Sequence, residues 1–173
     1  MDLIIKPTEA CNFKCSFCSS TAIDPNNAGL LDMDYIFRFL KRYPETKSLI
    51  INGGDPLMVD PSYYWKLIEH LDEHDYPAYI SFTTNLWPFY VKPEKWVDLF
   101  NHPRMGVCTS FQYGGGRLKG DFSEFTEEDF WNVSDKLQSV QTAGVCRDEF
   151  ESKQTSRMSG MSIRQCRLLE CAG

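Results

Sequence analysis

The stretch LIIKPTEACNFKCSFC, residues 3–18, places an apolar run shortly before three closely spaced cysteines. The run at residues 3–7 predicts a buried strand, and Cys11, Cys15 and Cys18 follow in the loop after it. Three thiols can make one disulfide and leave one thiol over, a zinc site that lacks one ligand, or three corners of an iron–sulfur cluster. The rest of the sequence must discriminate among these possibilities.

The composition is that of an ordinary globular domain with an acidic balance. The chain has 173 residues, of which 42% are apolar and 14% aromatic, and its formal net charge is −6, so one domain with a sizeable core is expected. Lys and Arg are scattered, which argues against nucleic-acid binding, and no run reaches the ~18 apolar residues that span a membrane. The N-terminus MDLIIKPTEA does not have the pattern of a signal peptide. We therefore expect a cytoplasmic protein whose seven cysteines are thiols, ligands or nucleophiles.

Strand-like and helix-like segments alternate along the chain. Apolar runs predict strands at residues 3–7, 48–52, 78–85 and 105–113. Amphipathic or capped segments predict helices at residues 30–43, 61–74, 93–100 and 126–137. This order predicts an α/β fold with a parallel sheet, built from about four βα units with right-handed crossovers.

The character of the chain changes after about residue 138. The last 35 residues contain one aromatic residue, Phe150, and no strand-like run, although the alternation predicts a fifth strand there. Two explanations stay open: a disordered or differently folded tail, and an altered reading frame. We therefore divide the chain into a core of residues 1–138 and an atypical tail of residues 139–173.

The cysteine spacing favours a cluster over a structural zinc site. A structural zinc ion takes four ligands, typically from two CxxC-like pairs, and the chain offers no second pair because Cys108 stands alone in a predicted strand. A cubane cluster held by three thiolates leaves one iron with an open coordination position. The C-x3-C-x2-C spacing lets one short loop wrap such a cluster.

The segment CNFKCSFC, residues 11–18, resembles the C-x3-C-x-aromatic-C signature of the radical S-adenosylmethionine (AdoMet) enzymes. The resemblance implies that Cys11, Cys15 and Cys18 hold a [4Fe–4S] cluster whose unique iron is chelated by AdoMet, and that Phe17 packs near the adenine. It implies a full or partial (β/α)6 barrel with this loop after the first strand. It also implies that an external one-electron reductant, such as flavodoxin or ferredoxin, drives cleavage of AdoMet to methionine and a 5′-deoxyadenosyl radical, which abstracts a substrate hydrogen.

A second motif supports this resemblance. NGGDP, residues 52–56, follows the second predicted strand, where the family has a GGE-like motif that contacts the amino group of AdoMet. Gly53 and Gly54 let the backbone approach a ligand closely, and a carbonyl or carboxylate oxygen accepts from an ammonium group. Asp55 stands where many members have Glu and is one methylene shorter, so the glycine carbonyls are the alternative contact.

Polar residues at the later strand ends are weaker candidates, because the carboxyl ends of barrel strands carry the site. Within FTTN (82–85) and TSFQ (109–112), the candidates for contact with AdoMet or substrate are Asn85, Ser110 and Gln112. No residue is assigned a catalytic role. The resemblance covers about residues 1–137, and the later family strands have no visible counterpart, so we expect the chain to lack the usual C-terminal part of the barrel.

Three further features have ordinary explanations. His70 and His74 have the spacing of a helical metal pair, but Leu71 replaces the glutamate of the zincin pattern, so a solvated helix face is expected. YGGGRLKG, residues 113–120, lacks the Gly-Lys-Ser/Thr ending of a phosphate loop and is interpreted as a mobile strand-end loop. The tail cysteines show no ligand pattern and are interpreted as incidental thiols: Cys146, Cys166 and Cys171.

The leading hypothesis is a radical AdoMet enzyme whose substrate is a peptide, a protein or a small molecule. One alternative is an activating enzyme that installs a glycyl radical on a partner protein, because GGDPL resembles activating enzymes for anaerobic ribonucleotide reductase. The other alternative is a non-catalytic module that binds an iron–sulfur cluster or zinc.

Overall fold

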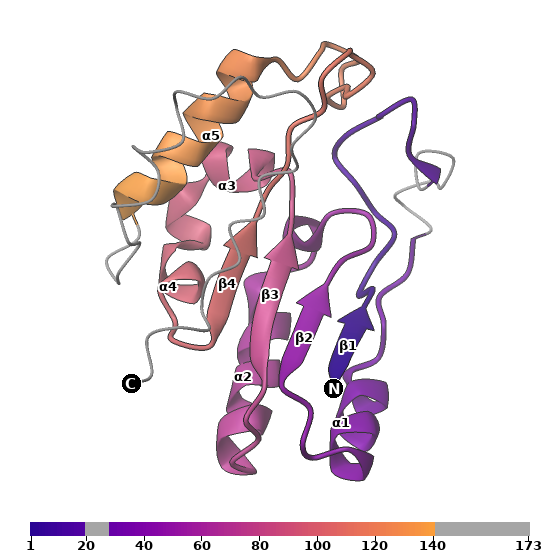
Figure 1. The fold of residues 1–173 in the computed structure, drawn as a ribbon, viewed down its shortest axis with the longest axis vertical. Coiled ribbons are helices and arrows are strands. Elements are labelled where there is room, and N and C mark those ends of the chain that lie inside the picture. The colour runs from indigo at the N-terminus through magenta and orange to yellow at the C-terminus, as the bar shows by residue number, and fades with distance from the viewer. Residues whose placement is uncertain (20–27, 141–173) are drawn as a thin grey trace.

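A computed structural model describes residues 1–19 and 28–140, and in this part of the chain four strands form one parallel sheet. Their order in the sheet is that of the sequence: β1 (Asp2–Ile5), β2 (Ser48–Ile51), β3 (Tyr79–Thr83) and β4 (Met105–Cys108). All four arrows in Figure 1 point the same way, so the loops that follow the strands lie at one edge. The predicted parallel α/β fold is confirmed, although the fourth strand ends at Cys108 rather than at residue 113.

One face of the sheet is buried and the other is partly open. Ile51 pairs with Ile5 and Phe82 across the sheet, and all three side chains are buried. Ile4, which precedes Ile5 and points to the opposite face, is 63% exposed. Because side chains alternate between the faces of a strand, β1 has one core face and one exposed face.

Two helices cover the buried face: α1 (Met33–Arg42) and α2 (Pro61–Glu73). Leu40 of α1 and Leu67 of α2 are completely buried and belong to the same core cluster as the strand residues. Each helix begins at an aspartate: Asp32 accepts from the backbone N–H of Asp34, and Asp60 accepts from that of Ser62. Figure 1 shows α2 behind the sheet.

The connection between β3 and β4 differs from the prediction of one helix at residues 93–100. The structure has three short pieces there: α3 (Trp87–Val91), η4 (Pro93–Lys95) and α4 (Val97–Phe100). Pro93 has no N–H to donate and restricts the residue before it, so α3 ends ahead of it. Trp96, between η4 and α4, is 1% exposed and anchors the connection in the core.

The last described helix is α5 (Glu127–Val140). Its predicted capping box is confirmed, because Thr126 and Asp129 each accept a hydrogen bond from the backbone N–H of the other. The helix continues two residues past the predicted boundary at 138, and the predicted tail lies outside the described residues from 141 onward, with Cys146, Cys166 and Cys171. None of the described helices is long and apolar enough to cross a membrane.

Candidate functional site

The three cysteines of the first loop lie beyond the carboxyl end of β1. Among the described residues none of the three forms a disulfide; Cys11 and Cys15 are half-buried against the core, and Cys18 is exposed. Phe13, between the first two, is 3% exposed and ties the loop to the core. The backbone N–H of Cys18 donates to the carbonyl of Cys15 at 3.2 Å, which turns the loop back on itself. The loop thus carries three thiols close together in sequence, and its base is fixed to the core.

The thiol of Cys11 has a strongly shifted pKa. Burial raises its pKa to about 11, the N–H of Phe13 opposes this rise, and the nearby Asp55, Cys15 and Cys18 add to it. Three thiolates and a carboxylate in one place repel one another, and a bound cationic centre relieves that repulsion. The donor set therefore fits a group with several positive metal ions.

The spread of the sulfur atoms fits a cluster better than one zinc ion. Among the described residues, the ligand atoms of His70, Glu73 and His74 all lie within 4.8 Å of one another. The sulfur atoms of the three cysteines do not lie that close together. A single zinc ion with Zn–S bonds of about 2.3 Å holds its sulfurs within about 4.6 Å of each other. In a cubane each thiolate binds a different iron, so the sulfurs lie farther apart.

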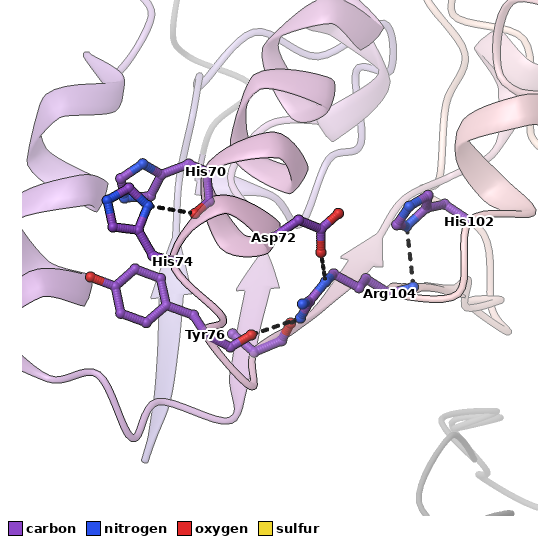
Figure 2. Close-up of polar contacts among 7 residues, drawn as sticks. His70, Asp72, His74, Tyr76, His102 and Arg104 are labelled. Atoms are coloured by element: carbon purple, nitrogen blue, oxygen red, sulfur yellow. Dashed lines mark hydrogen bonds and ion pairs between the residues drawn. The ribbon is translucent and has the colours of Figure 1, made fainter.

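The histidine group lies at the opposite edge of the sheet, where α2 ends and the chain leads into β3 (Figure 2). The ring of His70 stacks on Phe37 with a centroid separation of 3.7 Å, and Nδ1 of His74 bonds to the carbonyl of His70. Burial lowers the pKa of His70, and neighbouring His74 lowers it further. His70 therefore packs against α1 rather than standing on a fully solvated helix face.

At the same edge of the sheet, Arg104 connects α2 to the segment that leads into β3 (Figure 2). Its guanidinium donates to Asp72 at 2.6 Å and to the carbonyls of Tyr76 and Ala78 at 2.8 and 3.0 Å. These bonds fix the start of β4 to the end of α2. These bonds give Arg104 a structural role, and Arg104 lies far from the cysteine loop in the fold.

The GGDP turn after β2 packs directly on the chain that leads into the cysteine loop. The N–H of Gly54 donates to the carbonyl of Thr8 at 3.0 Å, and that of Asp55 donates to Ala10 at 2.8 Å. A Cβ on Gly54 would overlap the carbonyl oxygen of Ala10, and Gly53 has a φ of 115°. Only glycine permits this approach. Among the described residues, no donor reaches the carbonyl oxygens of Gly53 and Gly54.

Asp55 is buried and fully engaged by the protein. Its carboxylate accepts from the N–H groups of Leu57 and Asn85 at 2.9 and 2.8 Å and from the hydroxyl of Thr84. Burial raises the pKa of Asp55 to about 6, although these hydrogen bonds and the charge of Arg117 lower it. The predicted site residue therefore lies at the site, and its side chain holds the ends of β2 and β3 together.

Asn85 connects the end of β3 to the cysteine loop. Its Nδ2 donates to Oδ1 of Asn12 at 2.9 Å, and its Oδ1 accepts from the N–H of Trp87 at 2.9 Å. Asn85 is 5% exposed, so both partners shield it from water. Asn12 directly follows Cys11, and the bond therefore fixes the loop next to its first thiol.

The segment after β4 lies along the cysteine loop. The N–H groups of Lys14 and Ser16 donate to the carbonyls of Leu118 and Gly116 at 2.7 and 2.8 Å. YGGGRLKG is thus bound to the cysteine loop, unlike the mobile loop expected from sequence. Ser110, two residues after the end of β4, accepts from Nη1 of Arg117 through both its carbonyl and its hydroxyl oxygen.

Sequence reasoning missed Arg117. Its only local signal is its position, a single arginine in a glycine-rich segment that follows a strand end with predicted site residues. Nothing in the spacing shows that the segment turns back to pair with residues 13–16, because that pairing forms between distant parts of the chain.

The model of the Radical SAM superfamily matches residues 5–114, more than half of the chain. The chain belongs to the radical SAM superfamily. The solved structure of native anSMEcpe with bound AdoMet is similar to it, at 21% identity and a TM-score of 0.64, covering 80% of this chain and 41% of that one. The same protein with bound AdoMet and Cp18Cys peptide matches at 20% identity and a TM-score of 0.63, covering 80% and 40%. No curated protein sequence matches the chain.

These structural matches confirm the fold of a radical SAM partial barrel. The chain spans about two fifths of the length of the solved structures that it matches. Figure 1 shows the cysteine loop and the segment after β4 both rising beyond the arrowheads, at the edge where the fold places strand-end loops.

Two predicted site residues of this radical SAM chain stand outside the hydrogen-bonded network. Phe17 is 58% exposed next to the segment after β4, where a Cβ on Gly116 would lie 3.7 Å from its ring. Gln112 is exposed, and its Nε2 donates to the carbonyl of the adjacent Tyr113 at 3.3 Å. The structure thus brings together the cysteines, Asp55 and Asn85, and leaves these two side chains at the surface.

Proposed function

We propose that the chain binds a [4Fe–4S] cluster through Cys11, Cys15 and Cys18, binds AdoMet beside it, and acts as a radical SAM enzyme. The observation that carries this proposal is the cysteine loop itself: three cysteines, none of them in a disulfide, on a loop whose backbone is hydrogen-bonded to strand-end segments on both sides. When bound, the cluster supplies the electron that cleaves AdoMet to methionine and a 5′-deoxyadenosyl radical, which abstracts a substrate hydrogen.

The protein's own part is to hold and orient. The carbonyl oxygens of Gly53 and Gly54, which no described group engages, are acceptors for the ammonium group of AdoMet. Asp55 keeps these carbonyls in place through its bonds to the end of β3. The exposed ring of Phe17 is free to stack on an adenine.

Asn85, Ser110 and Gln112 have different parts in this proposal. Asn85 acts through Asn12 on the cysteine loop. Ser110 is engaged by Arg117, so it contributes through that contact, whereas the exposed Gln112 has room to meet AdoMet or substrate.

We further propose that the substrate is a peptide or protein. In this proposal the protein acts in the cytoplasm, where an external one-electron donor of the flavodoxin or ferredoxin type reduces the cluster. The partly open face of the sheet at Ile4 supports a large substrate. A similar solved structure, that of anSMEcpe, holds a Cp18Cys peptide together with AdoMet. A small-molecule substrate is the competing outcome.

The test is anaerobic reconstitution of the full chain with iron and sulfide, followed by addition of AdoMet and dithionite. We expect ~4 Fe per chain and release of 5′-deoxyadenosine. Cys18→Ala should lose the cluster, whereas Cys108→Ala, which removes a cysteine outside the loop, should keep it.

The outcomes separate the hypotheses. A cluster without AdoMet cleavage indicates a binding module, and zinc bound in place of iron rejects the cluster. Radical transfer to a co-purified partner that carries a glycyl-radical loop indicates an activating enzyme.

A further inference from the structure

Arg117 lies in a polar and aromatic setting against the cysteine loop. Its guanidinium carbon is 5.8 Å from the ring centroid of Phe13 and 5.2 Å from that of Phe125. Both rings are buried, at 3% and 2% exposure, and they contact each other at 5.2 Å between centroids. Since Phe13 stands between two of the cysteines, the guanidinium packs on the loop that carries the thiols.

The backbone on either side of Arg117 is fixed to the same loop. The carbonyls of Gly116 and Leu118 accept from Ser16 and Lys14, and Lys119 forms an antiparallel bridge with Phe13. Nη1 is held by Ser110. The position of the guanidinium is therefore set by backbone pairing rather than by a flexible side chain alone.

One polar atom of Arg117 is left over. Nε is buried and has no hydrogen-bond partner among the residues that the structure describes. Burial lowers the pKa of Arg117, and the charges of Cys15, Asp55 and Cys11 oppose that shift. A partly buried cation with an unsatisfied buried donor is costly unless negative charge lies nearby. The groups whose negative charge would offset this cost are the carboxylate of Asp55 and, when they are deprotonated, Cys15 and Cys11.

We propose that Arg117 is a positioning residue for the cysteine loop and supplies the fixed positive charge that stabilises the reduced state of the cluster. The proposal rests on the proposed function, because it needs a cluster on Cys11, Cys15 and Cys18. It adds a residue that the sequence motifs do not include.

The redox consequence follows from charge balance. Reduction of the cluster takes up one electron from an external one-electron donor, and no proton or bond changes at Arg117. The bound cluster with its three thiolates becomes more negative by one charge in this step. A guanidinium that packs on Phe13, between Cys11 and Cys15, and is partly buried favours the more negative state, as a fixed positive charge does where screening by water is reduced.

The experiment is an EPR-monitored redox titration of the reconstituted full chain with dithionite, comparing the wild type with Arg117→Gln and Arg117→Lys. We expect Arg117→Gln to lower the equilibrium constant for reduction about tenfold, which is ~59 mV toward negative potential for a one-electron couple. Arg117→Lys should restore most of this loss, because it keeps the charge. The matched control is Arg38→Gln, which removes one charge from the exposed side of α1 and should leave the potential unchanged.

The other outcomes are equally decisive. If Arg117→Gln holds no cluster but Arg117→Lys does, this result also confirms that the cluster requires a positive charge at position 117. If both variants keep the wild-type potential, or both lose the cluster while they stay folded by circular dichroism, the charge role is overturned. An unchanged potential with weaker AdoMet binding also overturns it and assigns the guanidinium to the AdoMet carboxylate. If the wild type itself assembles no cluster, the proposed function fails first.

Discussion

The hydroxyl of Thr84 lies 2.9 and 3.0 Å from the two carboxylate oxygens of Asp55, and this contact joins the end of β3 to the turn after β2. The same hydroxyl accepts from the N–H of Leu86, so it closes a small buried network. Asp55 is 2% exposed and Thr84 is 4% exposed, and water does not compete for these bonds. One carboxylate, that of Asp55, therefore connects the turn after β2 with the turn after β3. Both turns carry predicted AdoMet contacts, and the second leads into α3.

The first prediction concerns Asp55→Asn. The amide nitrogen of asparagine donates, and in the place of Oδ2 it would face the N–H of Asn85, which then loses its acceptor. A buried unsatisfied N–H costs about 1–3 kcal/mol, so the free energy of unfolding should fall by that amount. Urea denaturation of the metal-free protein measures it.

The control for this change is Asp60→Asn. Asp60 caps α2 by accepting from Ser62 and is exposed, and asparagine caps a helix about as well as aspartate. Its effect should stay within a few tenths of a kcal/mol. Equal effects of the two substitutions would contradict the buried network.

The second prediction is that Gly54→Ala separates the GGDP turn from the cysteine loop. The added Cβ would overlap the backbone carbonyls of Glu9 and Ala10, and backbone cannot rotate away as a side chain can. We expect a loss of stability of at least about 2 kcal/mol and faster loss of iron from the reconstituted protein to a chelator.

Gly29→Ala separates this steric effect from backbone strain. Gly29 also has a positive φ, 60°, but its added Cβ meets nothing within 4 Å. It should cost only the strain of a left-handed residue, about 1–2 kcal/mol, and leave iron retention unchanged. Faster iron loss in Gly29→Ala would show that the chelator assay reports general instability.

The sequence predicts the parts of the site that local patterns encode. The cysteine spacing and the glycine pair each lie within a few residues, and the alternation of elements places both at one edge of the sheet, as the structure has them. Arg117 depends on pairing between residues about 100 positions apart, which no local pattern specifies. The break of the predicted helix at 93–100 depends on Trp96, whose burial sets the direction of the chain between η4 and α4.

The third prediction concerns pH. The pKa of His70 is lowered in the folded protein by burial and by His74, so the unfolded chain binds its proton more readily. Where the unfolded state binds more protons, stability rises with pH. The contribution of His70 is therefore complete above its unfolded pKa, near 6.5, and is lost as the pH falls toward the folded value.

Urea denaturation at pH 7.5 and at pH 5 measures this effect as a difference between two proteins. His70→Phe keeps a ring against Phe37 and cannot be protonated, so it should lose less stability on acidification than the wild type. Asp55 titrates with the opposite sign in both proteins and cancels in the comparison. An identical loss in both proteins would rule out His70 as a source of acid sensitivity.

The fourth prediction tests whether the bond between Asn85 and Asn12 holds the cysteine loop in place. Asn12→Ala removes the acceptor of the buried Nδ2 of Asn85 and frees the residue next to Cys11. Because the loop keeps its backbone bonds from Lys14 and Ser16, we expect a modest loss of stability, about 1 kcal/mol, but several-fold faster release of iron to a chelator. Asn132→Ala, on the exposed side of α5, is the matched control and should change neither quantity. If Asn12→Ala lowers stability and leaves the rate of iron release at the wild-type value, the bond stabilises the fold without positioning the first thiol.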